Sequence, residues 1–136
     1  MKISTKGRYA LRMLVDLAAR GGEYTALRDI AAREHISKKY LEQIVPLLHA
    51  AGIIQTGRGV RGGYRLSAPP ERFSVGDILR ATEGSLAPVS CLERGAPECE
   101  RRGECMTLAV WRGLARVMND YLDRITLKDV LEGRIP

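Results

Sequence analysis

Apolar side chains recur at helical spacing in the first part of the chain. In residues 4–20 they share one face, which is formed by Tyr9, Met13, Leu14, Leu17 and Ala18. Gly21 and Gly22 follow this segment and predict its end. A second, short helix is predicted after Thr25, whose hydroxyl can cap it. Its inward-facing side chains are Leu27, Ile30 and Ala31. The pattern therefore predicts two helices before residue 35.

A third helix is predicted from a cap at Ser37 to about residue 51, where Gly52 stops it. Its buried face has apolar residues three and four positions apart, at Leu41, Ile44, Val45 and Leu48. Pro46 lies inside this helix and removes a backbone donor, so we expect a bend there. Only His35 and Ile36 connect the second helix to the third. Two helices joined this tightly are typical of a helix-turn-helix.

Two short segments, residues 53–56 and 64–67, predict the strands of a hairpin. They flank the sequence GRGVRGG at residues 57–63, whose four glycines make a flexible tip. Arg58 and Arg61 lie in this tip, where they can enter a minor groove or contact the DNA backbone. Three helices followed by a hairpin predict a mostly α fold with a small β-hairpin wing, a winged helix-turn-helix.

The second half of the chain contains two capping-box patterns. Ser74 with Asp77 predicts a helix to about residue 83, and Thr126 with Asp129 predicts a short last helix. Between them, a long helix is predicted over residues 106–124. Its main apolar stripe consists of Leu108, Trp111, Leu114, Ala115, Met118 and Leu122. A second stripe consists of Val110, Val117 and Tyr121. Because a small chain cannot easily bury both stripes, we expect a self-association surface.

Charge is unevenly divided between the two halves of the chain. The net charge is +6, and residues 1–70 carry twelve Lys and Arg against five Asp and Glu, which is +7. Residues 71–136 carry ten against eleven, which is −1. An ordinary solvated basic surface would show the same excess. Together with the predicted helix-turn-helix and its basic hairpin, the charge favours binding of double-stranded DNA by the first half.

The start of the third helix supplies the candidate base contacts, because this helix of a helix-turn-helix enters the major groove. Lys38 and Lys39 suit phosphates or guanine edges. Gln43 can pair with adenine, and Glu42 can accept a hydrogen bond from cytosine N4. The candidate DNA-binding residues of this helix are therefore Lys38, Lys39, Tyr40, Glu42 and Gln43.

The three cysteines of the chain, Cys91, Cys99 and Cys105, lie within fifteen residues. The window CLERGAPECERRGEC is polar and contains glycine and proline, so it predicts a loop that cannot bury three thiols. No apolar run approaches the roughly 18 residues that span a membrane, and the first ten residues do not resemble a signal peptide. A cytoplasmic location is therefore expected, where structural disulfides are rare. This favours a bound metal or metal cluster, with a partial disulfide or unliganded thiols as alternatives.

The chain resembles the Rrf2 family of winged-helix transcription regulators, and most of all its iron–sulfur cluster regulator branch (IscR-like). The matching segments are residues 1–10 (MKISTKGRYA), 40–43 (YLEQ), 58–64 (RGVRGGY), 77–84 (DILRATEG), the three-cysteine loop and 126–129 (TLKD). The resemblance implies a DNA-binding domain at residues 1–68. It implies that residues 69–136 hold a ligand loop, about 88–105, and a helix that pairs two copies as a homodimer. It also implies a [2Fe–2S] cluster held by Cys91, Cys99 and Cys105.

One position departs from the family pattern. Well-known members have a histidine three residues after the third cysteine, where this chain has Leu108. The fourth ligand is thus left open between water, a small thiol, the first helix of another subunit, and a carboxylate of the loop. The loop carboxylates are Glu93, Glu98, Glu100 and Glu104.

The expected function is regulation of transcription by a homodimer whose operator binding depends on the cluster, with repression or activation left open. Sensing by thiol oxidation, nitric oxide or cysteine metabolism is the alternative on the same fold. A zinc site of three cysteines with a glutamate or histidine is also permitted. An enzyme and a small-molecule substrate are not expected, because no catalytic triad, paired carboxylates or phosphate-binding loop is recognisable.

Overall fold

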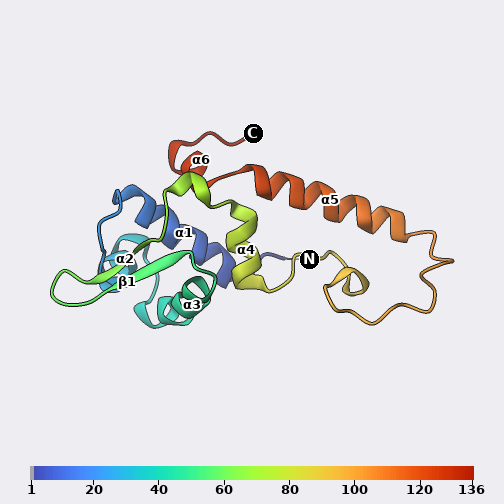
Figure 1. Ribbon diagram of the computed structural model, residues 1–136, viewed down its shortest axis with the longest axis horizontal. Coiled ribbons are helices and arrows are strands. Elements are labelled where there is room, and N and C mark those ends of the chain that lie inside the picture. Colours follow the sequence, from blue (N-terminus) through green and yellow to red (C-terminus); the bar gives the residue numbers. More distant parts are fainter. Residues whose placement is uncertain (1) are drawn as a thin grey trace.

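The computed structural model describes residues 2–136 and has the predicted fold, mostly α with a two-stranded antiparallel hairpin (Figure 1). The elements are α1 (Thr5–Ala19), α2 (Leu27–Glu34), α3 (Lys38–Ala50), β1 (Ile54–Gly57), β2 (Gly63–Leu66), η1 (Pro70–Arg72), α4 (Val75–Glu83), η2 (Ser90–Leu92), α5 (Leu108–Arg124) and α6 (Leu127–Glu132). Figure 1 shows α1–α3 and the hairpin at one end, while α5 extends away from them to the three-cysteine loop.

The hydrophobic core lies where α1, α2 and α3 meet. Its fully buried large side chains are those of Met13, Leu14, Leu17, Ile30, Leu41, Ile44, Leu48, Ile78 and Leu127. The helical faces predicted for α1 and α3 therefore point inward. Burying each such side chain contributes about 1.5–3 kcal/mol. Ile78 of α4 and Leu127 of α6 belong to the same core, so the second half of the chain helps to fold the first.

The helix-turn-helix is shaped by a left-handed residue and a serine cap. His35 ends α2 with φ 53°, and its N–H donates to Ala31 O. Ser37 Oγ then accepts from Tyr40 N at 3.1 Å, as the sequence predicts. From this cap α3 continues through Pro46 to Ala50. The two helices are thereby held at a fixed angle by only three connecting residues.

The predicted cap of α2 is wrong. This helix follows Ala26, and no side chain caps it. Thr25 instead forms an antiparallel β-bridge with Tyr64, in which Thr25 N donates to Tyr64 O at 2.8 Å and Tyr64 N donates to Thr25 O at 2.9 Å. The reason is tertiary: the extended backbone that Thr25 needs for this pairing places the helix start beyond the reach of its hydroxyl. The wing is thus tied to α2.

Both predicted capping boxes are confirmed, and they lie next to each other. Ser74 caps Asp77 and Thr126 caps Asp129, each with both reciprocal hydrogen bonds. An antiparallel bridge joins Ser74 to Thr126. The pKa of Asp129 is lowered by its hydrogen bonds from the backbone and hydroxyl of Thr126 and by Arg134. These paired caps hold the start of α6 beside the start of α4.

Helix α4 contacts α1 on one side and α5 on the other. Glu83 Oε1 accepts from the backbone N–H of Ser4 at 2.9 Å and from its hydroxyl at 2.7 Å. Arg80 Nη2 donates to Asn119 Oδ1 at 2.7 Å and to Asp123 Oδ1 at 2.7 Å. Residues three apart on α4 therefore join the winged helix to the long helix.

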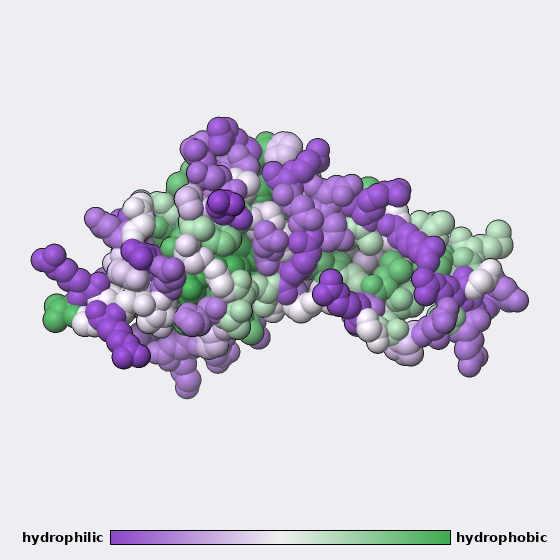
Figure 2. Space-filling view, in the orientation of Figure 1, coloured by the Kyte–Doolittle hydropathy of each residue, from purple (hydrophilic) through white to green (hydrophobic). Residues whose placement is uncertain are grey.

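Helix α5 begins at Leu108, two residues later than predicted, and none of its residues is fully buried. Val110 is 60% exposed, Val117 64% and Tyr121 40%. Figure 2 shows hydrophobic surface among hydrophilic side chains at the end of the molecule that holds α5 and the three-cysteine loop. The second apolar stripe is therefore open within one chain. No helix described over residues 2–136 combines the length and the apolar character needed to cross a membrane.

Replacing Leu127 tests whether α6 completes the core. Leu127 is fully buried, whereas Leu131, one turn later, is 40% exposed. We expect Leu127→Ala to lower the free energy of unfolding by about 2–5 kcal/mol because it leaves a cavity. Leu131→Ala should change it by no more than about 0.5 kcal/mol. Urea unfolding at one protein concentration measures both, and equal losses would contradict this packing.

Candidate functional site

The exposed start of α3 and the tip of the hairpin form a candidate nucleic-acid interface. Lys38, Lys39, Glu42 and Gln43 are exposed. An ion pair of 4.0 Å links Lys38 Nζ to Glu42 Oε1, one helical turn away. Such exposed pairs are weak, so both side chains remain free to turn to a ligand. The structure thus presents four of the five predicted α3 residues on the surface.

Tyr40, the fifth, is only half-buried and packs against α1. Its ring meets the Tyr9 ring edge-on, with centroids 5.4 Å apart. Tyr9 is in turn 5.2 Å from the guanidinium carbon of Arg12. The ring of Tyr40 therefore helps to set the position of α3 on α1, a packing role that sequence reasoning did not foresee.

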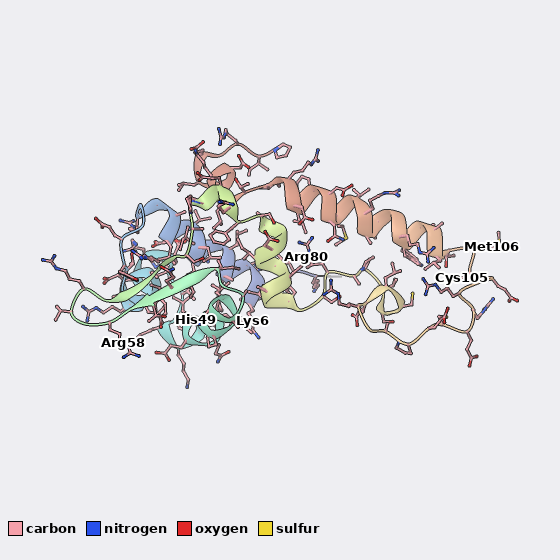
Figure 3. All side chains as sticks on the ribbon, in the orientation of Figure 1. Lys6, His49, Arg58, Arg80, Cys105 and Met106 are labelled. Carbon is pink, nitrogen blue, oxygen red and sulfur yellow. The ribbon has the colours of Figure 1, made fainter. Side chains whose placement is uncertain are left out.

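The hairpin tip lies beside the helix-turn-helix. Arg58 and Arg61 are exposed, and in Figure 3 the labelled Arg58 lies at the hairpin, far from Cys105. An open cleft between α2, α3 and the hairpin is lined by Arg28, Lys38 and Glu42 and, from the hairpin, by Gly59, Val60, Gly62, Gly63 and Tyr64. Lys38 and Glu42 of α3 thus border the same cleft as the hairpin tip, and Arg61 lies on the neighbouring surface that Arg28 also lines.

Sequence reasoning missed Arg28. Its side chain is 81% exposed, and it borders both the cleft beside Lys38 and the surface beside Arg61. The sequence did contain a signal for it. Arg28 is a cationic residue in the first turn of α2, and the first helix of a helix-turn-helix crosses the DNA backbone.

Two other basic residues of the first half, Arg33 and Arg12, form hydrogen bonds within the protein. Arg33 Nε and Nη2 donate to the two oxygens of Asp16 at 2.9 and 2.7 Å, and the Asp16 side chain is only 6% exposed. The hydrogen bond to Asp16 raises the pKa of Arg33. Arg12 donates to the backbone oxygen of Glu34. These contacts join α1 to α2. The exposed positive charges of Lys38, Lys39, Arg58 and Arg61 take no part in them.

The second candidate site is a pocket at the N-terminal end of α5. It has a volume of about 140 Å³, room for several water-sized groups. Cys91, Cys99 and Cys105 all line it, although thirteen residues lie between the first and the last of them in sequence. The other lining residues are Leu92, Ala96, Pro97, Glu98, Arg102, Leu108 and Arg112. The fold thus brings the three predicted cysteines to one place.

All three cysteines are free thiols. Within residues 2–136, no three His, Cys, Asp or Glu side chains gather closely enough to hold one metal ion. The three thiols that line this pocket match in type the ligands of a [2Fe–2S] cluster, whose two irons are held by cysteine thiolates. Three cysteines would supply three of the four protein ligands of such a cluster.

Cys105 has an environment that favours its thiolate. A hydrogen bond from Thr107, whose Oγ1 is 3.4 Å from Cys105 Sγ, lowers the pKa of this thiol. The backbone of Thr107 and Leu108 and the charge of Arg101 lower it further. Because its hydroxyl faces Cys105, Thr107 gives α5 no side-chain cap. The hydroxyl that could have capped α5 thus favours the Cys105 thiolate instead.

Leu108 places an apolar side chain in the pocket where the resemblance leads one to expect histidine. The chain's two histidines lie elsewhere, His35 in the turn before α3 and His49 on α3. Figure 3 shows His49 and Cys105 in separate parts of the molecule. Of the four loop carboxylates considered from the sequence, only Glu98 lines the pocket.

Comparison with known proteins gives matches over nearly the whole chain. A family model described as Rrf2, an iron-dependent transcriptional regulator, matches residues 3–133. Protein rrf2 of Nitratidesulfovibrio vulgaris is 41% identical over 132 residues, 96% of this chain and 87% of that protein. Among solved structures, CymR of B. subtilis, described as the global cysteine regulator of that organism, is 37% identical with a TM-score of 0.78 and 97% of each chain covered. IscR of T. potens is 35% identical with a TM-score of 0.78, covering 98% of this chain and 88% of that one.

Alkylation of Cys105 tests its environment. In the Cys91→Ser, Cys99→Ser background only Cys105 reacts, and its thiolate is the nucleophile. Because the folded pKa is lowered, we expect its reaction with iodoacetamide to persist at a lower pH than for an ordinary cysteine. Thr107→Val removes the donor and should move the pH profile upward, whereas Thr56→Val on the wing should not. An unmoved profile in Thr107→Val would refute the role of this hydrogen bond.

Proposed function

This chain belongs to the Rrf2 family of DNA-binding transcription regulators, and we propose that an iron–sulfur cluster held by Cys91, Cys99 and Cys105 controls its binding to an operator. The observation that carries the proposal is the single pocket that all three thiols line. The family and the relatives CymR and IscR are described as transcriptional regulators, so we assign the pocket to sensing rather than to catalysis.

The pocket residues suit a [2Fe–2S] cluster in softness and in charge. Thiolates are the soft ligands that such clusters take. Arg102 and Arg112 line the pocket and offset the negative charge of several thiolates. A cluster at this site would supply sensitivity to oxygen and to electron transfer. Because its pKa is lowered, Cys105 loses its proton more readily than an ordinary cysteine, as a metal ligand must.

We further propose that two copies pair through α5. Its apolar residues Val110, Val117 and Tyr121 are exposed in one chain, and pairing would bury them. A twofold dimer presents two α3 helices, which must reach half-sites about 34 Å apart. In this arrangement residues 1–68 bind DNA, and residues 69–136 hold the ligand and the partner. Since its target is chromosomal DNA, we place the protein in the cytoplasm.

Helix α4 offers the physical connection between the pocket and DNA. The loop enters α5 at Leu108, and Arg80 holds α5 through Asn119 and Asp123. Glu83 holds the start of α1 through Ser4. Ordering of the loop by a ligand would bias the angle between α5 and α4, and through it the separation of the two α3 helices.

Thiol sensing is the second candidate function, and two observations favour it. The structurally similar CymR is described as a cysteine regulator, and Cys105 of this chain has a lowered pKa. Cys91 and Cys99 are exposed and accessible to oxidants. Iron and acid-labile sulfide distinguish the two functions, because a thiol sensor needs neither. A zinc protein would be colourless.

Arginine substitutions in the wing test the DNA interface. Arg58→Ala or Arg61→Ala should weaken operator binding and reduce the slope of log affinity against log salt by about 0.9 for each phosphate that the variant no longer neutralises. Arg116→Ala, an exposed arginine of α5, is the matched control and should leave the slope unchanged. Fluorescence anisotropy at several salt concentrations measures this, and an unchanged slope in both wing variants would rule out wing contacts with phosphate.

Purification without oxygen tests the cluster. We expect visible absorbance with iron and sulfide in equal amounts, and an operator affinity that changes about 5- to 150-fold on loss of the cluster. Cys91→Ala should abolish that change while the protein stays folded, and Ser90→Ala should preserve it. Wild-type protein without iron and sulfide, or with equal affinities in both states for every operator tested, would overturn the proposal.

A further inference from the structure

We propose that Glu98 supplies the fourth protein ligand of the cluster, the one that Leu108 does not provide. The inference rests on the proposed function, because it completes the same site. It assigns to the loop of a single chain an oxygen donor in place of the histidine that the resemblance leads one to expect.

The first argument is the set of donors that the fold places at the pocket. Besides the three cysteines, the polar side chains lining it are those of Glu98, Arg102 and Arg112. A guanidinium has no lone pair to offer a metal. The carboxylate of Glu98 is therefore the remaining side chain that can bind iron from within the pocket.

The second argument is the contrast with the other loop carboxylates. Glu98 precedes Cys99 in the sequence and Glu100 follows it. The two side chains have the same chemistry, yet Glu100 does not line the pocket. Glu93 and Glu104 do not line it either. A glutamate next to a cysteine in sequence therefore does not necessarily reach the pocket. The path of the loop places one of the four glutamates, Glu98, at the pocket.

The third argument is that Glu98 is free to move to a metal. Its side chain is 79% exposed, and its ionic partner is Arg102, with Nη1 3.9 Å from Oε1. Exposed pairs at this separation are weak. Iron would exchange this contact for a bond, and Arg102 would remain beside the site to balance the charge of the thiolates.

A hard oxygen donor beside three soft thiolates has a chemical consequence. Iron in such a site is held less firmly on the oxygen side, because carboxylates suit harder metals than thiolates do. The Glu98 bond would therefore be the point at which the cluster opens to oxygen or to another small molecule. Replacing that oxygen with a sulfur should close it.

The decisive experiment compares Glu98→Gln with Glu100→Gln, both in the full chain prepared without oxygen. We expect Glu98→Gln to alter the visible and electron paramagnetic resonance spectra and to lose iron to a chelator about tenfold faster or more, since weaker perturbations outside the ligand shell already cost this much. Glu100→Gln should match the wild type. Thermal unfolding of the apo-proteins should show that both variants fold.

Two further variants test the assignment by a gain of cluster stability and not only by a loss of iron. Glu98→Cys should give an all-thiolate spectrum and a cluster that survives air longer than the wild type, while Glu100→Cys should not. Leu108→His should restore the ligand of the relatives, so that adding Glu98→Gln no longer accelerates iron loss.

The outcomes separate the two proposals. A wild-type protein with iron and sulfide, in which Glu98→Gln and Glu100→Gln keep the wild-type spectrum and rate, would overturn the assignment of Glu98 and leave the cluster in place. The ligand would then be water, a small thiol or a residue of a second subunit. A wild-type protein without iron and sulfide would overturn the proposed function itself.

Discussion

The position of α4 between α1 and α5 is the constraint on which the rest of the structure depends. Glu83 binds Ser4 at the start of α1, and Arg80 binds Asn119 and Asp123 on α5. A Cβ at Gly76 would collide with the Asp123 carboxylate, so a larger residue at this position would force that side chain to move away from α4. Without this junction α5 would have no fixed direction, because none of its residues is fully buried. Under the proposed function, a ligand near α5 would influence DNA binding through α4, which contacts both α1 and α5.

The three-cysteine loop shows how a site can be placed without a hydrophobic core of its own. Its residues are polar, and its shape is set by turns and by the start of α5. Thr107 contributes to both, because its hydroxyl faces Cys105 rather than capping the helix. Such a loop gains more order from a bound group than a packed segment would. This property suits a sensor, whose two states must differ in structure.

Local signals predicted much of the fold, and tertiary pairing explains where they failed. The caps at Ser37 and Ser74 form as expected because each depends on residues within one turn. The cap at Thr25 does not form, since Tyr64, distant in sequence, pairs with its backbone. Tyr40 was expected at DNA and lies partly against Tyr9 for a similar reason. A single sequence carries no record of which distant partner a residue will meet.

The sequence by itself determined the winged helix, the basic first half and the clustering of three cysteines, because periodicity, charge and spacing are local properties. It left four glutamates equivalent as candidates near those cysteines. Only the tertiary structure placed Glu98 with the thiols in one pocket and left Glu100 outside. It also added Arg28 to the wing surface and set Arg33 against Asp16. The physical reason is that a pocket depends on how a loop folds back on a helix, which is decided by contacts between residues far apart in the chain.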